Sequence, residues 1–488
     1  MKQKSLKLNF IMNVLLTLSS VIFPIITFPY VSRILTPVGT GKVSFATSLI
    51  TYFSMFAQLG IPTYGIRACA KVRDNKKELS RTVHELLFIN CISSIIAYIV
   101  LGIMLIYINR LQEERMLYII ISFSIILTSF GVEWLYKALE QYTYITIRSV
   151  IFKFIALVAM FLLIHKPEDY VLYGGITIFA ASASNILNLI NVHKYIYIKW
   201  MRKYNVVRHL KAVIIFFAMA CATTIYTNLD TVMLGFMSND ISVGYYNAAV
   251  KIKVLLVQVV ASLGGVLLPR CSYYIENNMM YDFKRICTKA LEFVFVVSIP
   301  LVIYFVFFAK IAIYFLSGEA YEGAIVPMQI IMPTVLFIGL TNILGLQILV
   351  PLGKEKIVLI SEIVGAISDL TLNAILIPKF SASGAAFGTL IAELMVFCVQ
   401  FYALKEQIIY MLKKIPYIKI IVAAIIPLIL LIKIMVLNIG IVLKLIISGG
   451  LYFGIYGILL LLLKEDLIIE IYMQLLDKMN IIRGKNDE

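Results

Sequence analysis

The sequence predicts an all-α, polytopic membrane protein that crosses the bilayer about 14 times. Apolar residues make up 61% of its 488 residues and charged residues only 14%, with a mean hydropathy of +0.94. Because about a quarter of the residues in a soluble domain are charged, this composition indicates a chain embedded in lipid. Nearly uncharged stretches of about 20 residues, the length of helix that spans ~30 Å of hydrocarbon, recur along the whole chain.

These stretches are predicted to be helices rather than the strands of a barrel. Barrel strands alternate apolar and polar residues, whereas these runs are continuously apolar. Lipid offers no partner for backbone polar groups, so each span must satisfy its own. In chain order, the expected spans are 9–31, 41–59, 84–108, 116–136, 144–165, 170–191, 212–237, 243–268, 290–310, 324–349, 357–377, 384–404, 416–437 and 441–463.

Basic residues gather in every second connection between these spans. If the N-terminus is cytoplasmic, 31 of the 43 Lys and Arg residues lie on the inner side and nine on the outer side. Cytoplasmic loops collect Lys and Arg, so this excess predicts that both termini are cytoplasmic. The net charge of +16 then reflects orientation and contact with anionic membrane lipid. Nucleic-acid binding is not expected.

A weak internal repeat divides the chain. Three pairs of segments align at an offset of 203 to 204 residues: Gly41–Ala46 with Gly244–Ala249, Leu59-Gly60 with Leu263-Gly264, and Glu78–Arg81 with Asp282–Arg285. They predict two six-helix parallel repeats, a construction that transporters use for alternating access. The expected parts are an N-terminal lobe over 1–205, a C-terminal lobe over 206–410, and two additional helices with a cytoplasmic tail over 411–488.

Polar segments are too short and too scattered for most enzyme classes. The predicted outer loops are short, so no extracellular catalytic domain is expected. The four histidines have no metal-ligand spacing, and no glycine-rich phosphate loop with its Lys is present. The remaining classes of function are a passive or ion-coupled carrier and a channel. The internal repeat favours the carrier.

Ionisable residues inside spans are functional candidates because each costs at least about 2.5 kcal/mol at mid-membrane unless it is paired or hydrated. Three pairs of such residues lie at matching distances from a predicted turn: Asp230 with Lys251, Asp369 with Glu393, and Glu133 with Arg148. For the third pair an ion pair is the expected role. For the first, an interhelical ion pair and a cation site both remain open.

Oxygen-bearing side chains near these carboxylates favour the cation site. Carboxylate, amide and hydroxyl oxygens suit Na⁺, and crowded carboxylates can instead share a proton. The expected coupling ion is therefore Na⁺ or H⁺, with no other cofactor. The predicted ion-coupling residues are Asp230, Asp369, Asn373, Thr389 and Glu393, and the first four would hold Na⁺.

Two lysines inside spans, Lys153 and Lys253, have no partner at matching depth. They could bind an anionic substrate group or reach toward the membrane interface. The full set of predicted substrate-binding cations is Lys42, Arg148, Lys153, Lys251 and Lys253. Four tyrosines, whose default role is to anchor helix ends at the interface, could instead line a sugar path: Tyr142, Tyr144, Tyr245 and Tyr246.

Several segments of the chain resemble one known family. They are Arg33–Gly41 (RILTPVGTG), Glu133–Ser149 (EWLYKALEQYTYITIRS), Lys166–Tyr173 (KPEDYVLY), Asn228–Lys251 (NLDTVMLGFMSNDISVGYYNAAVK), Ile377-Pro378 and Gly384-Ala385-Ala386. Over residues 5 to 405, the chain is thus similar to the Wzx-type polysaccharide repeat-unit flippases of O-antigen and capsule synthesis. These belong to the multidrug/oligosaccharidyl-lipid/polysaccharide exporter superfamily.

The resemblance implies a carrier of undecaprenyl-diphosphate-linked oligosaccharide in the bacterial inner membrane, moving it from the cytoplasmic to the outer leaflet. A polysaccharide polymerase and its chain-length machinery would be partners. In the related lipid II flippases a sodium site lies between the seventh, eleventh and twelfth helices, and Asp230, Asp369, Asn373 and Thr389 match it by spacing. The Asp and Asn of the eleventh helix are exchanged here, so the ion stays open. The last two helices would hold the lipid tail.

Two alternatives remain open. A drug or cation antiporter of the same superfamily would use the acidic residues without diphosphate-binding cations. A structural scaffold for the polysaccharide machinery would leave the charges inside the membrane unexplained.

Overall fold

The computed structural model describes residues 6–199, 201, 203–262, 264–436, 440–470 and 472–473. Within these residues every regular element is a helix. Ten helices in this part of the chain are long and apolar enough to cross a membrane, or 11 if one pair bent by 43° counts as a single span. The predicted all-α, polytopic class is confirmed, whereas the number of 14 spans stays a prediction.

The chain divides into two compact units, Met1–Asn247 and Ala248–Glu488. The first unit contains the whole predicted N-terminal lobe and continues through one further long helix. The predicted division into 1–205, 206–410 and 411–488 stays a prediction.

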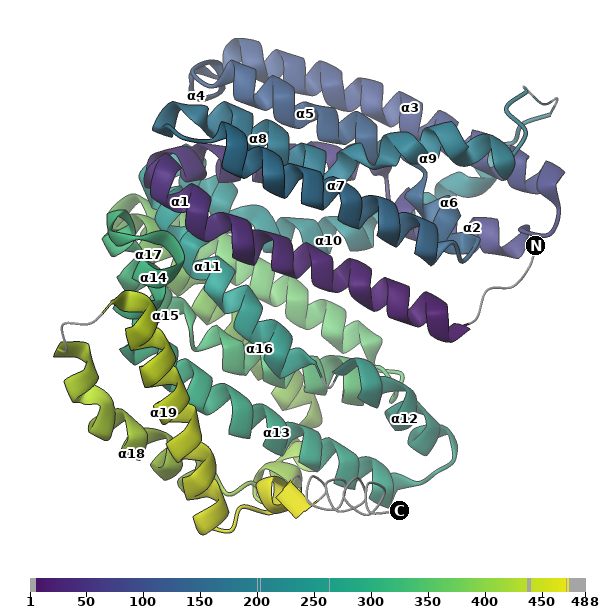
Figure 1. The fold of residues 1–488 in the computed structure, drawn as a ribbon. Helices are drawn as coiled ribbons and strands as arrows, with labels where there is room; N and C mark the ends of the chain where they lie inside the picture. The colour runs from purple at the N-terminus through teal and green to yellow at the C-terminus, as the bar shows by residue number, and fades with distance from the viewer. Residues whose placement is uncertain are drawn as a thin grey trace, which may run out of the picture. The chain divides into compact units, whose positions relative to one another are not determined.

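Helices of the first unit lie side by side along α1, drawn in purple in Figure 1. Its elements are α1 (Leu6–Gln58), α2 (Ile61–Lys71), α3 (Lys76–Tyr107), α4 (Asn109–Gln112), α5 (Arg115–Ser129), α6 (Glu133–Ala138), α7 (Tyr142–Leu163), η1 (Pro167–Asp169), α8 (Tyr170–Ile178), η2 (Phe179–Ala183), α9 (Asn185–Asn191), η3 (Val192–Lys194) and α10 (Val207–Met237). The next helix, α11 (Asp240–Ala261), begins in the first unit and continues into the second.

Two very long helices each contain two predicted spans. Helix α1 has 53 residues, about 80 Å of helix at about 1.5 Å per residue, which is far more than one bilayer needs. Its backbone breaks at Thr36 (φ 60°, ψ 179°), because the following Pro37 disfavours the helical conformation for the residue before it. Helix α17 (Glu355–Leu412) also breaks, at Ser381 (φ 48°, ψ −124°), with no proline directly after the break.

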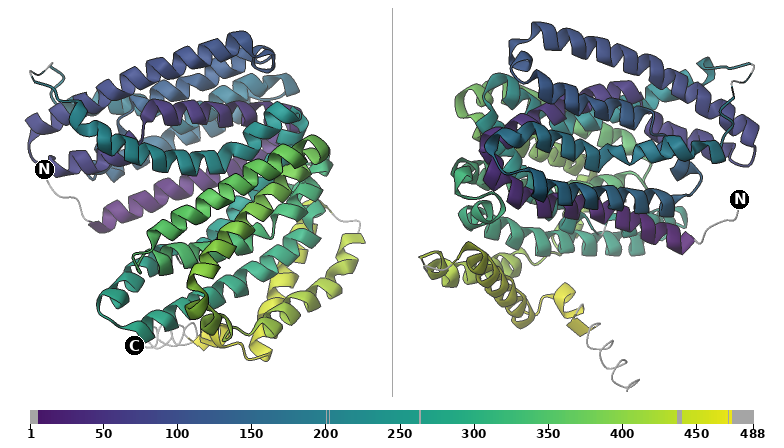
Figure 2. Two further views of the ribbon diagram at one scale, coloured as in Figure 1. Left: turned by 180° about the vertical axis from the view of Figure 1, so that it is seen from behind. Right: turned by 45° about the horizontal axis from the view of Figure 1, so that its top comes forward.

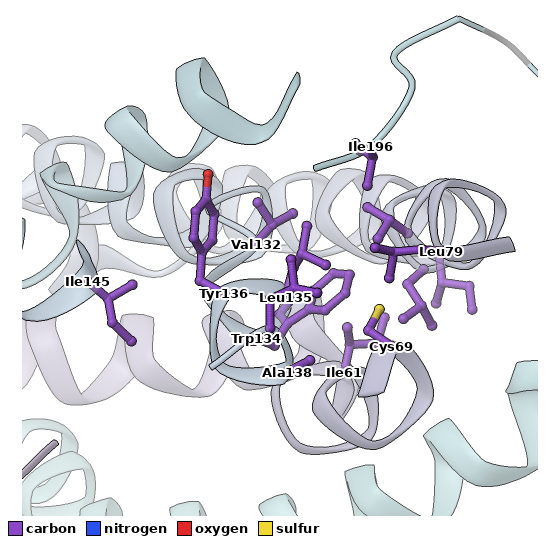
Figure 3. Close-up of a cluster of buried hydrophobic side chains, with 14 of the residues drawn as sticks. Ile61, Cys69, Leu79, Val132, Trp134, Leu135, Tyr136, Ala138, Ile145 and Ile196 are labelled. Carbon is purple, nitrogen blue, oxygen red and sulfur yellow. The ribbon is translucent and has the colours of Figure 1, made fainter. Parts of the chain in front are cut away.

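A hydrophobic cluster holds one end of the first unit together (Figure 3). Trp134 and Leu135 of α6 lie at its centre and are buried with Ile61 of α2 and Leu79 of α3. Gly65 permits this packing, since a Cβ there would lie 2.7 Å from the Trp134 ring. The short helices α2 and α6 are therefore held in place by this cluster, and so are the ends of the connections that follow them.

Helices of the second unit surround α13 and α17. Its elements are α12 (Gly264–Glu276), α13 (Met280–Phe307), α14 (Ala309–Ser317), η4 (Glu319–Ala324), α15 (Ile325–Ile331), α16 (Thr334–Asn342), η5 (Ile343–Leu349), α17, α18 (Tyr417–Val436) and α19 (Ile441–Leu462).

The last two helices, α18 and α19, form an antiparallel pair that packs against α13 (Figures 1 and 2). Lys419 Nζ at the start of α18 donates to the Lys464 carbonyl just after α19, at 2.8 Å. The Tyr304 hydroxyl of α13 lies 2.8 Å from Ser448 Oγ of α19. Tyrosine hydroxyl bonds are strong in an apolar surrounding, so this pair is firmly attached to the second unit.

Contacts within the first unit join residues that are predicted to lie on the same side of the membrane. Arg208 contacts Glu85 at one end, and Lys42 contacts Glu114 at the other. Helices that alternate in direction require this grouping. Which end faces the cytoplasm stays a prediction; below, "inner" and "outer" denote the predicted sides.

Candidate functional site

Arg148, one of the predicted substrate-binding cations, is held in an ion pair inside the first unit. Its Nη2 donates to Glu133 Oε2 at 3.0 Å, and its Nη1 donates to Ser184 Oγ at 2.6 Å. The Arg148 side chain is only 3% exposed. The predicted Glu133–Arg148 ion pair is confirmed, and Lys137 also contacts Glu133, at 2.9 Å. The Arg148 charge is thus paired within the protein, with a carboxylate that it shares with Lys137.

Lys153, five residues further along α7, has different neighbours. Its Nζ donates to Ser19 Oγ at 2.9 Å and to Ser20 Oγ at 2.7 Å, both on α1. Within the described part of the chain, no carboxylate oxygen lies within 4.0 Å of this ammonium group. The side chain is half-buried in its helix. Two neutral hydroxyls orient the cation without neutralising it, so it can still attract an anion.

Four of the predicted ion-coupling residues lie on the two arms of α17, on either side of its break. Asp369 and Asn373 lie on the first arm, Thr389 and Glu393 on the second, and all four are at least nine-tenths buried. Asn373 Nδ2 donates to Asp369 Oδ1 at 3.2 Å. Gly388 lets the two arms approach closely, because a Cβ at this position would overlap Asn373 Oδ1.

The oxygen atoms of this group fit a small hard cation. Carboxylate, amide and hydroxyl oxygens are the donors that such ions prefer. Thr389 Oγ1 already donates its proton to the Ala385 carbonyl at 3.0 Å, which leaves its lone pairs as acceptors. Oxygen donors of this kind suit Na⁺ or a shared proton, and the identity of the ion stays a prediction.

The fifth predicted ion-coupling residue, Asp230, lies on α10 in the first unit. It is 7% exposed and accepts a short hydrogen bond from the Tyr246 hydroxyl of α11. Tyr246 was predicted either to anchor a helix end or to line a sugar path, and the structure gives it this carboxylate as a partner.

Lys251 and Lys253, the remaining predicted cations inside spans, are both half-buried on α11. Two residues on a helix are about 200° apart, so the two ammonium groups point to different sides of α11. The predicted Asp230–Lys251 pairing and the complete sodium site stay predictions.

Lys42, predicted to bind substrate, lies at the outer end in a pair with Glu114. Its Nζ is 2.5 Å from Glu114 Oε1 and 4.7 Å from the centre of the Tyr170 ring. The Tyr170 hydroxyl donates to the same carboxylate at 2.6 Å. Lys42 therefore ties α1 to the segment before α5 and to α8.

A second contact at the outer end was not predicted. Arg110 forms an ion pair with Asp240, the first residue of α11, and donates to the Gly235 carbonyl at 3.2 Å. Gly235 and Asp240 flank the turn between α10 and α11, so Arg110, which lies on α4, holds this turn against α4. One indication of the Arg110–Asp240 pair was present in the sequence: both residues lie in predicted outer connections.

Two glycines make a reciprocal contact beside this ion pair. A Cβ on Gly41 would overlap the Asp240 carbonyl, and a Cβ on Gly244 would overlap the Pro37 carbonyl. These residues are equivalent in the sequence repeat, because Gly41 with Gly244 and Pro37 with Asp240 are both 203 positions apart. The same turn of each repeat therefore packs against the other at backbone distance.

A buried carboxylate at the inner end was also not predicted. Glu85 is fully buried and accepts hydrogen bonds from Arg208 Nη2 at 2.6 Å and from the Asn205 backbone N–H at 2.7 Å. His209 Nε2 lies 2.7 Å from the same carboxylate. Glu85 stands at the start of a predicted span, which could have marked it as an ionisable residue inside the membrane.

Comparisons with known proteins agree on one group. The sequence profile of the family described as "Polysaccharide biosynthesis protein" matches residues 6–275. Two curated relatives are named "Putative O-antigen transporter". The one from Escherichia coli K12 is 24% identical over 80% of this chain and 95% of its own, and the one from Shigella dysenteriae is 25% identical over 82% and 100%.

Solved structures of low sequence identity share the fold. The lipid II flippase MurJ in an inward closed conformation aligns with a TM-score of 0.69 and 16% identity, over 93% of this chain and 100% of its own. An inward-facing multidrug resistance transporter of the MATE family aligns with a TM-score of 0.59 and 13% identity, over 81% and 96%.

Proposed function

The chain belongs to the polysaccharide biosynthesis protein family, and from this premise we propose that it moves undecaprenyl-diphosphate-linked oligosaccharide from the cytoplasmic to the outer leaflet. The membership agrees with the predicted resemblance to the Wzx-type flippases and makes the protein a multi-pass membrane transporter. The proposal adds the lipid-linked cargo, the direction of transport and the bacterial inner membrane. Polysaccharide polymerase and chain-length machinery would act on the product.

The observation that carries this proposal is the environment of Lys153. The oligosaccharide is too polar to cross hydrocarbon and needs a hydrated path, whereas the lipid tail can stay in the bilayer. The diphosphate between them needs a cation that is not already neutralised. Lys153 is oriented by Ser19 and Ser20 and meets that need through charge-assisted hydrogen bonds.

The oxygen-rich group on α17 supports ion coupling as the second part of the proposal. An ion that binds one conformation more tightly than the other shifts the balance between them. The coupling ion, Na⁺ or H⁺, would be held by Asp369, Asn373, Thr389 and Glu393, and Asp230 stays the fifth predicted ion-coupling residue.

Neutral replacement tests the coupling. Asp369→Asn and Asp230→Asn should each lower export while membrane abundance stays normal, because an amide keeps the shape but loses the charge that binds the ion. Export is measured as surface polysaccharide per unit of protein, across a range of external Na⁺ and pH. Full export in both single variants and in the double variant would remove the coupling proposal and leave the transport proposal intact.

The glycine contact at the outer end supports alternating access. Release on the outer side would require the α10–α11 turn to move away from α1, and the reciprocal packing of Gly41 and Gly244 would then define the closed state. Because glycine has no Cβ, the two backbone segments can come into direct contact when the outer side closes and can separate again when it opens.

Adding one methyl group tests this closure. Gly41→Ala should prevent the close approach to the Asp240 carbonyl and lower export about tenfold, an effect of about 1.4 kcal/mol. Gly102→Ala is the matched control, because a Cβ there meets no atom within 4 Å. Accessibility of a Cys introduced at Val38, which is 40% exposed, should rise in the Gly41 variant. Unchanged accessibility and export would contradict the closure.

The drug or cation antiporter remains the second candidate, since a multidrug transporter shares the fold. Deletion of the gene separates the two. We expect lipid-linked oligosaccharide to accumulate on the cytoplasmic leaflet with unchanged drug sensitivity. Raised drug sensitivity with normal oligosaccharide distribution would instead support the antiporter, and neither change would support the scaffold.

A further inference from the structure

The connection that follows η3 crosses the inner end of α3 and is attached to it at two points. We call residues 195–206 the strap; the structure describes all of them except 200 and 202. At the first point Ile196 enters the hydrophobic cluster beside Leu79 (Figure 3), and the Tyr197 backbone N–H donates to Ser80 Oγ at 2.9 Å. The start of the strap is therefore fixed to α3.

The second attachment lies one turn further along α3. The Tyr204 hydroxyl is 3.0 Å from His84 Nδ1, and the Asn205 backbone N–H donates to Glu85 at 2.7 Å. The strap then continues directly into α10, where Arg208 and His209 contact the same carboxylate. The strap thus connects α3 to the start of α10.

Between these attachments α3 and the strap line an open pocket of about 380 Å³. This volume is within the range of small-molecule sites. Four of its seven lining residues are apolar, and the set consists of His84, Glu85, Leu87, Phe88, Ile198, Tyr204 and Val206. An apolar chain fits such a lining better than a sugar or a free ion does.

The charges around the pocket favour an anionic ligand. The Glu85 carboxylate already accepts from Arg208 and lies beside His209, so its negative charge is compensated. Lys194, Lys199 and Lys203 stand exposed on or next to the strap, and within the described part of the chain none of their ammonium groups lies within 4.0 Å of a carboxylate. The uncompensated charge beside the pocket is therefore positive.

Exposed apolar side chains on the strap favour contact with a membrane surface. Tyr197 is 51% exposed and Ile198 69% exposed, next to Lys199. Aromatic and aliphatic residues interleaved with lysines are typical of segments that lie at the lipid headgroups.

We propose that the pocket between α3 and the strap binds a bilayer phospholipid with an anionic headgroup. One acyl chain lies against Leu87, Phe88 and Val206, and the headgroup phosphate lies among the strap lysines. A bound lipid holds the strap to α3 and, through Arg208 and His209, holds the start of α10. The site shares no residue with the proposed cargo-binding and ion-coupling residues and does not depend on the transport proposal.

Lipid binding to the full-length, delipidated protein in detergent tests this site. Native mass spectrometry and thermal unfolding would be followed with phosphatidylglycerol, with phosphatidylcholine of identical chains, with inorganic phosphate, and with undecaprenyl diphosphate. We expect phosphatidylglycerol to bind at least about tenfold more tightly than phosphatidylcholine, and inorganic phosphate to stabilise little. Equal binding of the two phospholipids, full stabilisation by inorganic phosphate alone, or binding of only undecaprenyl diphosphate would each overturn the proposal.

Variants locate the binding in the pocket. Ile198→Asp places a carboxylate at the exposed pocket wall and should abolish the preference, whereas Tyr281→Asp, at a residue that is 77% exposed elsewhere, should not. Lys199→Gln with Lys203→Gln should reduce the preference for phosphatidylglycerol to about twofold. Lys405→Gln with Lys413→Gln is the matched pair of exposed lysines and should leave it unchanged. Wild-type binding in both the Ile198 variant and the Lys199/Lys203 variant would refute the site.

Discussion

Helix α7 carries two basic side chains, five residues apart, that differ in their partners and in their exposure to solvent. Arg148 is 3% exposed, paired with Glu133 and bonded to Ser184. Lys153 is half-buried and contacts two serine hydroxyls of α1. Five residues rotate a helix by about 140°, so the two side chains leave α7 toward different neighbours.

The difference separates a charge that serves the fold from a charge that can serve transport. A buried guanidinium with its carboxylate costs little as long as both are present, and much once one is removed. Neutral hydroxyls do not cancel the charge of an ammonium group. Such a group therefore attracts an anion more strongly than a cation that is already paired with a carboxylate does. Both stay predicted substrate-binding cations, and these surroundings favour Lys153 over Arg148 for that role.

Removing the Glu133 carboxylate, the partner of Arg148, should have a larger effect than any change around Lys153. Glu133→Gln leaves Arg148 buried without its counter-ion, which we expect to cost about 3 kcal/mol of folding stability. Membrane abundance and the apparent Tm in detergent should both fall. Lys137→Gln removes only the half-exposed partner of Glu133 and should change Tm little. A wild-type Tm for Glu133→Gln would show that the pair does not stabilise the fold.

Removing the lysine charge should affect transport without affecting the fold. Lys153→Gln is expected to lower export about tenfold, the loss of one charge-assisted hydrogen bond to phosphate, at normal abundance. Lys153→Arg keeps the charge and should retain most export. If Gln and Arg are tolerated equally, the lysine merely reaches toward the interface and binds no anion.

Removing the hydroxyls should have the smallest effect. The double variant Ser19→Ala/Ser20→Ala keeps the cation but frees its position, and we expect export to fall about threefold with unchanged Tm. Thr17→Ala, whose hydroxyl bonds only the Asn13 carbonyl of its own helix, is the control. A loss as large as that of Lys153→Gln would mean that the serines themselves contact the cargo.

Hairpin symmetry predicted some of these contacts and missed others. Glu133 and Arg148 flank one short turn, so equal distance along two antiparallel helices was enough to predict their meeting. Asp369 and Asn373 are one helical turn apart on the same arm of α17, so the period of the helix was enough to predict that they are neighbours. The Arg110–Asp240 pair and the Glu85–Arg208 pair join residues more than 120 positions apart, and no local spacing identifies such partners.

The sequence by itself determined the class of this protein, an all-α fold with apolar runs long enough to cross a bilayer, because lipid dictates composition and span length directly. The family followed from the resemblance of particular segments. The tertiary structure decided which charges are compensated. That outcome depends on which helices are neighbours: Arg148 meets a carboxylate and a hydroxyl, whereas Lys153 meets two hydroxyls of α1. The repeat of Gly41 and Gly244 was visible in the sequence, but its meaning as a close contact between equivalent turns came only from the packed backbone.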